Sequence, residues 1–74
     1  SKKDAFADAK ISLAQAIAVA EKETGGKTVL AKAKLEDHVL YYQVIVTKRG
    51  KNASELLYVN ATNGKITDRE REDD

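Results

Sequence analysis

Residues 11–26 read ISLAQAIAVAEKETGG, and this stretch carries both the helical period and the boundary signals around which the rest of the chain is organised. Ser12 is a typical N-cap residue, and Gln15 three positions later completes a capping-box pattern. Gly25 can adopt the left-handed conformation that closes a helix. The sequence therefore predicts a helix that begins near Leu13 and ends by Thr24.

The apolar residues of this helix share one face. They fall at positions i, i+3, i+4 and i+7, and they are Leu13, Ala16, Ile17 and Ala20. Four alanines keep the helix narrow, so we expect it to lie close against a sheet; they are Ala14, Ala16, Ala18 and Ala20. It carries no catalytic group.

The composition allows one small domain and excludes several classes of function. The chain has 74 residues, and its 42% hydrophobic and 34% charged content is that of a soluble globular domain. A net charge of +1 gives no reason to expect nucleic acid or an anionic membrane as partner. No apolar run approaches the roughly 20 residues that span a bilayer, so we expect no membrane insertion. Because no signal-peptide core opens the chain, we expect a cytosolic protein or the mature form of an exported one.

After the helix the chain alternates with the period of β-strands. Strands are predicted at residues 28–36, 39–47, 53–60 and 65–68, with turns or loops at residues 37–38, 48–52 and 63–64. We expect residues 1–10 to form an arm, residues 11–68 the domain, and the charged tail 69–74 to fray.

The turn lengths set the strand register. A two-residue turn at 37–38 places four residue pairs opposite one another, namely Leu35 and Leu40, Ala33 and Tyr42, Ala31 and Val44, and Val29 and Val46. A four-residue loop at 49–52 places Val44 opposite Leu57 and Tyr42 opposite Val59. The predicted fold class is α+β, with one N-terminal helix packed on a four-stranded antiparallel meander sheet as a two-layer sandwich.

The same register predicts an aliphatic row on the face away from the helix. Leu30 opposes Ile45, Ile45 opposes Leu56, and Tyr41 and Tyr58 flank the row. Two explanations stay open: the row supports the sheet through cross-strand contacts, or it is a contact surface for a second copy or another protein. The candidate partner-contact residues are Leu30, Tyr41, Ile45, Leu56 and Tyr58.

The sequence offers no set of residues for catalysis or metal binding. His38 is the single histidine and there is no cysteine, so neither a nucleophile with its base nor a zinc-ligand pattern is present. Only Tyr41 and Tyr58 are available to stack on bases, which is too few for a nucleic-acid surface. We therefore expect no enzyme activity, no catalytic or metal-binding residues, no cofactor and no nucleic-acid partner.

The order of these motifs resembles the PepSY domain, a family of peptidase propeptide-like domains. The resemblance rests on Ile11-Ser12, Ala16-Ile17, Ala20, the Gly25-Gly26-Lys27 exit, the alternation of Tyr42, Val44 and Val46, and the closing residues 58–66, YVNATNGKI. The family's closing signature is Val-Asp-Ala-x-Thr-Gly-x-Val. Asn60 stands where the family usually has Asp and Asn63 where it usually has Thr, and both keep turn-forming side chains.

The resemblance implies a function that the residue patterns alone do not. PepSY domains are non-catalytic modules found in propeptides of thermolysin-like metalloproteases and in bacterial exported or membrane-anchored proteins, and they are thought to restrain proteases. The resemblance thus implies an exported protein-binding module, periplasmic, secreted or in the cell envelope, that inhibits or regulates an exported protease. The alternative is a structural domain that self-associates as a homodimer and inhibits nothing. Tandem copies are common in the family, so the chain can also be one unit of a longer protein.

Overall fold

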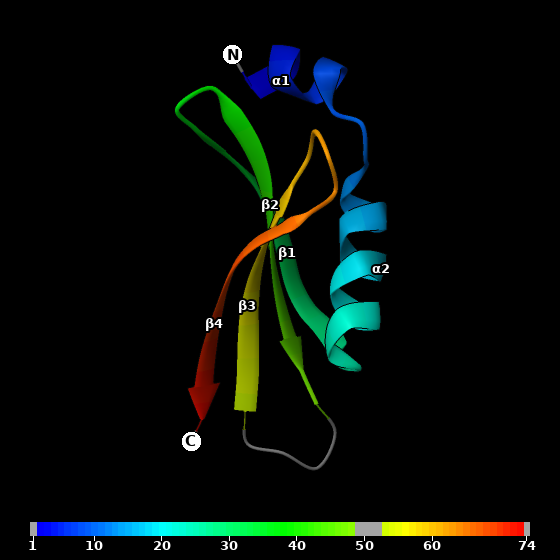
Figure 1. The fold of residues 1–74 in the computed structure, drawn as a ribbon, viewed down its shortest axis with the longest axis vertical. Coiled ribbons are helices and arrows are strands. Elements are labelled where there is room, and N and C mark those ends of the chain that lie inside the picture. Colours follow the sequence, from blue (N-terminus) through cyan, green and yellow to red (C-terminus); the bar gives the residue numbers. More distant parts are fainter. Residues whose placement is uncertain (1, 49–52, 74) are drawn as a thin grey trace.

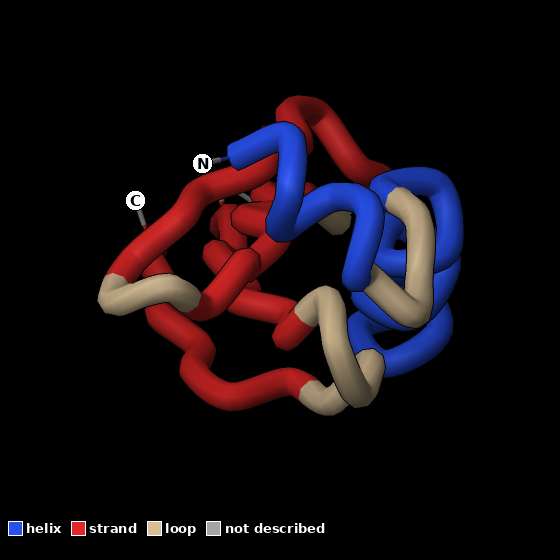
Figure 2. The backbone as a smooth tube through the Cα atoms, turned by 90° about the horizontal axis from the view of Figure 1, so that it is seen from above, coloured by secondary structure: helices blue, strands red, loops and turns tan. Residues whose placement is uncertain are grey.

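One layer of helices and one layer of strands make up the fold (Figures 1 and 2). The computed structural model describes residues 2–48 and 53–73. In chain order the elements are α1 (Lys2–Asp8), α2 (Leu13–Thr24), β1 (Lys27–Glu36), β2 (Val39–Thr47), β3 (Ala53–Asn60) and β4 (Ile66–Asp73). The strands form one antiparallel sheet in the order β1-β2-β3-β4, and α2 packs on the first three. The predicted α+β meander is confirmed.

The boundaries of α2 are those that its capping residues predict. The Ser12 hydroxyl accepts from the Gln15 backbone N–H at 3.1 Å, and the Gln15 side chain accepts from the Ser12 N–H at 2.8 Å. Gly25 closes the helix in the left-handed conformation with φ of 73°. A Cβ atom on Gly26 would lie 2.8 Å from the Thr47 carbonyl oxygen, so the exit of α2 passes too close to β2 for a side chain.

Small helix residues and large strand residues build the core. Ala16 and Ala20 are fully buried, which lets α2 approach the sheet closely. The largest fully buried side chains come from β2 and β3, and they are Tyr42, Leu57, Val44, Val46 and Val59.

Among the described residues, Tyr42 is the one large, fully buried side chain with a polar end. Its hydroxyl donates to the Ile11 carbonyl at 2.9 Å, so the buried oxygen has a partner just before α2 begins. Burial raises the pKa of Tyr42 above its ordinary value of 10.0 because the interior disfavours the phenolate.

The strand register agrees with the turn-based prediction except at one end of β1. The pairs Leu35 with Leu40, Ala33 with Tyr42, and Ala31 with Val44 are confirmed, as are Val44 with Leu57 and Tyr42 with Val59. The Asp37-His38 turn has the two positive φ angles, 48° and 66°, of a tight hairpin. The predicted loop residues 49–52 lie outside the described residues.

The predicted pairing of Val29 with Val46 is wrong. A β-bulge between Thr28 and Leu30 leaves Val29 without a partner across the strands, and Thr28 pairs with Val46 instead. Val29 is 63% exposed. The bulge accompanies the link to α2, because the Thr28 backbone N–H donates to a Glu21 carboxylate oxygen at 2.8 Å.

Both ends of the chain are more regular than predicted. The arm contains α1, and the fourth strand extends through Asp73 where residues 69–74 were expected to fray. The prediction of fraying is wrong for residues 69–73, since each pairs with a residue of β3. Alternation along β4 turns Arg69 towards Glu55 on the covered face, so the first residue of the expected tail is fixed by an ion pair.

Candidate functional site: the open face of the sheet

The two faces of the sheet differ in what covers them. α2 covers one face, whereas none of the elements in residues 2–48 and 53–73 packs over the other, which we call the open face. Alternation along each strand fixes which side chains lie there. The open face comprises Lys27, Leu30, Lys32, Lys34 and Glu36 of β1, Val39, Tyr41, Gln43, Ile45 and Thr47 of β2, Ser54, Leu56, Tyr58 and Asn60 of β3, and Asp68, Glu70 and Glu72 of β4.

An aliphatic row crosses this face as the sequence predicts. Leu30 pairs with Ile45, and Ile45 pairs with Leu56. Leu30 is 47% exposed, and the other two side chains are half-buried. Glu70 of β4 continues the row, so it ends in a carboxylate at the far edge.

A neighbouring row runs from a cation to an anion. It consists of Lys32, Gln43, Tyr58 and Asp68, each paired with the next across the strands. The Gln43 side-chain amide donates to the Tyr58 hydroxyl at 3.0 Å, and only 8% of Gln43 is exposed. This hydrogen bond fixes both side chains at the centre of the open face.

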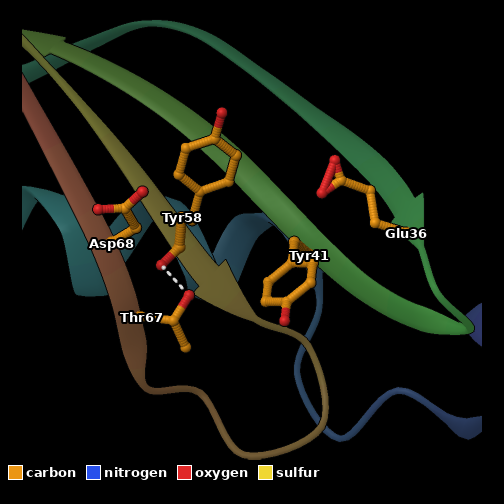
Figure 3. A pocket seen from close by; sticks show the side chains of 5 residues that line it. All are labelled: Glu36, Tyr41, Tyr58, Thr67 and Asp68. Atoms are coloured by element: carbon orange, nitrogen blue, oxygen red, sulfur yellow. Dashed lines mark hydrogen bonds between the residues drawn. The ribbon is translucent and has the colours of Figure 1, made fainter.

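The two tyrosines of the face border a shallow hollow (Figure 3). Tyr41 rises from β2 and Tyr58 from β3, with Glu36 at one side and Thr67 and Asp68 at the other. Thr67 is the extra residue of a bulge in β4 opposite Tyr58 and Val59. Each tyrosine offers an apolar ring for packing and a hydroxyl for a hydrogen bond. Such side chains, flanked by carboxylates, suit contact with a surface that is partly apolar and partly polar.

Charge is distributed unevenly across the open face. The cations lie on β1 and are Lys27, Lys32 and Lys34. The anions on the opposite edge are Asp68, Glu70 and Glu72. Glu36 is the exception on β1, and it forms an exposed ion pair with Lys34 at 3.3 Å. The face therefore has a basic edge and an acidic edge, separated by aliphatic and aromatic residues.

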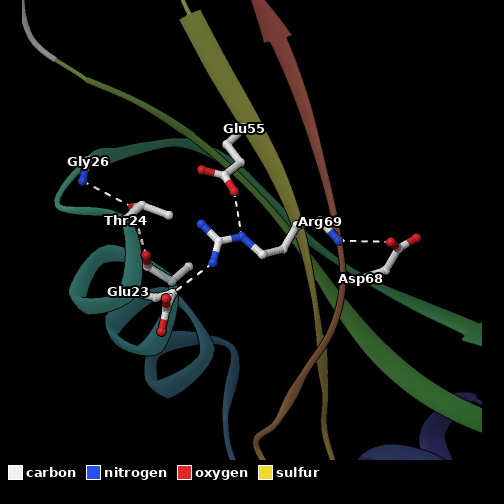
Figure 4. Close-up of polar contacts among 7 residues, drawn as sticks. Glu23, Thr24, Gly26, Glu55, Asp68 and Arg69 are labelled. Carbon is white, nitrogen blue, oxygen red and sulfur yellow. Dashed lines mark hydrogen bonds and ion pairs between the residues drawn. The ribbon is translucent and has the colours of Figure 1, made fainter.

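A second charged cluster joins the sheet to α2 on the covered face (Figure 4). The Arg69 guanidinium donates to Glu55 at 2.5 Å and to Glu23 of α2 at 3.2 Å. The hydrogen bond from Arg69 lowers the pKa of Glu55 below its ordinary 4.5, with smaller electrostatic contributions from Arg69, Arg71 and Lys48. This cluster ties β4 to the helix layer. Arg69 contacts both carboxylates of the cluster, so we assign it a structural role.

No metal-binding arrangement is found in the described part of the chain. His38 is exposed in the β1–β2 turn, as the sequence predicts. No three side chains among residues 2–48 and 53–73 are grouped as metal ligands. Over the same residues, no helix has the length and apolar character needed to cross a membrane.

The structure brings together most of the residues that the sequence nominates for partner contact. Tyr41 and Tyr58 line the same hollow, and Ile45 and Leu56 border a smaller one beside Glu70 and Glu72. Leu30 lies at the basic edge, next to Ile45.

Sequence reasoning missed the Gln43–Tyr58 hydrogen bond and the acidic edge of the face. The signal for the acidic edge was present in the run DRERE at residues 68–72, where acidic and basic residues alternate with the period of a strand.

Comparison with known proteins supplies a family. The PepSY family model, described as the peptidase propeptide and YPEB domain, matches residues 10–70 of the chain. Comparison with curated proteins and with solved structures gives no match.

Proposed function

Because the chain belongs to the PepSY family, we propose that it is a non-catalytic protein-binding module that restrains or regulates an exported peptidase. The family description associates this domain with peptidase propeptides, which supports a peptidase as the class of partner. The proposed contact surface is the open face, through Leu30, Tyr41, Ile45, Leu56 and Tyr58.

The observation that carries this proposal is the contrast between a covered and an uncovered row of large residues on the same strands. Ile45 lies between Val44 and Val46, which are almost fully buried, and yet it is only half-buried itself. A face needed only for solubility would present polar residues at these positions. The open face instead presents aliphatic residues at its centre and charged residues at its edges, which is the anatomy of a protein interface.

The tyrosines support the same assignment. Tyrosine is enriched at protein interfaces because it loses little conformational entropy on binding and offers both an apolar ring and a hydroxyl. Tyr41 and Tyr58 are half-buried and come from the two central strands. A partner that covers them would contact the middle of the sheet and would not need to pair with its edges.

The location belongs to the same proposal. We place the protein outside the cytoplasm, periplasmic, secreted or in the cell envelope, since an inhibitor must meet an exported peptidase there. Fractionation of the source cells tests this: recovery in the cytoplasm alone would contradict it.

Peptidase inhibition tests the function directly. Purified protein is titrated into a panel of exported peptidases, thermolysin-like metallopeptidases first, and residual cleavage of a fluorogenic peptide is measured. We expect at least one peptidase to be inhibited by the wild-type protein and at least tenfold less by Ile45→Lys, because a buried lysine would lose its hydration at the interface.

The matched control is Ala18→Lys, which adds the same charge on an exposed position of α2. We expect this variant to inhibit as the wild type does. The proposal fails if no peptidase is inhibited, or if Ile45→Lys inhibits as strongly as Ala18→Lys while both variants remain folded by circular dichroism.

A further inference from the structure

The basic and acidic edges of the open face make it complementary to itself. We propose that two copies of the chain pair through their open faces, with β1 of each copy over β4 of the other. This inference rests on the surface that the proposed function uses, and it names a second copy as an occupant of that surface when no peptidase is bound.

The row Lys32–Gln43–Tyr58–Asp68 shows why the match is specific. It crosses the whole sheet, from one edge strand to the other. A two-fold axis parallel to the strands, midway between β2 and β3, reverses the row end for end. Lys32 then lies over Asp68 of the second copy, and Gln43 lies over Tyr58 of the second copy.

Two other rows also bring matching residues together, although at the ends of the aliphatic row Leu30 lies over Glu70 of the second copy. In the aliphatic row, Ile45 comes to lie over Leu56 of the second copy, which buries the apolar centre of both faces. Further along the strands, Lys27 shares a row with Thr47, Ser54 and Glu72, so its ammonium group comes over the carboxylate of Glu72. In a two-fold interface every such contact occurs twice. The first residue of the pair comes from one copy in one contact and from the other copy in the second contact.

The other way of stacking two open faces is disfavoured by charge. A two-fold axis across the strands places β1 over β1 and β4 over β4. The lysines of the two copies would then meet at one edge, and Asp68, Glu70 and Glu72 would meet the same acidic set at the other. Like charges in close contact are unfavourable, so electrostatics selects the arrangement with β1 over β4.

The face is large enough for a reversible contact. Four strands at about 4.8 Å and about eight residues at about 3.3 Å give a face of roughly 19 by 26 Å. Stable interfaces bury about 800 Å² on each partner, so a face of this size belongs at or below the lower end of that range. Face-to-face packing of twisted sheets is also a standard arrangement, with the strands of the two layers about 30° apart.

Exchange of charges between the two edges tests the arrangement, measured on the purified chain alone by sedimentation equilibrium. Lys32→Glu places an acid over Asp68, and Asp68→Lys places a lysine over Lys32, so each variant repels its own copy twice. We expect the wild-type mass to rise with concentration from 8.1 kDa towards twice that value. We expect each single variant to dissociate at least tenfold more readily.

An equimolar mixture of the two variants is the decisive sample. In the mixed pair, the glutamate introduced at position 32 would face the lysine introduced at position 68 of the other copy. At the second contact the native Asp68 and Lys32 would face each other, so both contacts become attractive. We expect the mixture to regain association close to that of the wild type. The arrangement is overturned if the mixture stays at 8.1 kDa, or if Lys32→Glu associates better with the wild type than with Asp68→Lys.

Two further results separate the ways in which the test can fail. If either variant loses the circular dichroism signal of the folded protein, Lys27→Glu and Glu72→Lys take their place. In the proposed pair Lys27 lies over Glu72 of the second copy, just as Lys32 lies over Asp68. A wild-type chain that stays monomeric up to millimolar concentration overturns the inference and leaves the peptidase assay unaffected. A dimer with the expected charge exchange but no inhibited peptidase supports the inference while the proposed function fails.

Discussion

The covered and open faces of the sheet are built from the same strands and from similar residues, but they differ in what covers them. Tyr42, Val44 and Leu57 point towards α2 and are at most 1% exposed. Their sequence neighbours Tyr41, Ile45 and Leu56 point the other way and remain half-buried. The comparison teaches that contact with the helix, not residue type, separates the fully buried side chains from those that remain partly accessible.

The largest expected difference between the faces is at neighbouring leucines. We expect Leu57→Ala to lower the free energy of unfolding by about 2–5 kcal/mol, because it leaves a cavity in a fully packed core. We expect Leu56→Ala to cost at most about 1 kcal/mol, since its side chain has only cross-strand neighbours and solvent around it. Urea unfolding followed by circular dichroism measures both. Equal losses would mean that the open face is as important for stability as the core.

A smaller difference is expected at the neighbouring tyrosines. Tyr42→Phe removes the hydroxyl that donates to the Ile11 carbonyl, and we expect a loss of about 1 kcal/mol. Tyr41→Phe is the matched control, and we expect it to leave the free energy of unfolding within about 0.5 kcal/mol of the wild-type value. Thermal unfolding of both variants measures the difference. A larger loss for Tyr41→Phe would contradict the assignment of the buried contact.

The smallest expected effect concerns the ion-pair cluster on the covered face. The pKa of Glu55 is lowered in the folded protein, so its contribution to stability is present above the unfolded value near 4.5 and disappears as the pH falls through the lower, folded value. We expect Glu55→Gln to cost roughly 0.5–1 kcal/mol at pH 7, because Arg69 is partly exposed and solvent screens the pair.

The pH dependence distinguishes this charge effect from a packing effect. Wild-type stability should fall more steeply than that of Glu55→Gln as the pH falls below 4.5, as measured by urea titration at each pH. Parallel pH profiles would show that Arg69 does not stabilise the ionised Glu55. Glu36 provides the comparison on the open face, where we expect Glu36→Gln to change the free energy of unfolding at pH 7 by less than about 0.5 kcal/mol because its ion pair with Lys34 is exposed.

The sequence was sufficient to predict the fold and register wherever local chemistry and side-chain pattern agreed. A two-residue turn at Asp37-His38 fixes which residues of β1 and β2 meet, and the alternation of β2 then decides which face turns inward. The aliphatic row was predictable for the same reason. Only Val29 departed from the predicted register, at a bulge beside the tertiary hydrogen bond between Thr28 and Glu21, which no local pattern predicts.

The extension of the C-terminal strand beyond residue 68 escaped prediction for a different reason. Residues 69–74 are all charged, and composition alone favours a solvated tail. What holds Arg69 in the strand is a pair of contacts to Glu55 and Glu23, and the second of these lies on a distant helix. The acidic edge of the open face, and with it the charge complementarity of the candidate site, follows from that strand and was missed with it.

The alternating charges of β4 also bear on whether copies of this protein join into fibres. β4 is an outer strand of the four-stranded sheet, and such strands are the usual starting points for uncontrolled sheet growth. Suppose that the β4 strands of two molecules paired antiparallel with their sheet faces continuous. Glu70 would then lie opposite Glu70 of the other molecule, and Arg69 would lie opposite Arg71. In every other register that keeps the faces continuous, acidic residues again lie opposite acidic residues and arginines opposite arginines within residues 68–72. Repulsion between like charges along residues 68–72 therefore disfavours the addition of another molecule's strand to β4. The protein should resist amyloid-like aggregation through this edge even when concentrated.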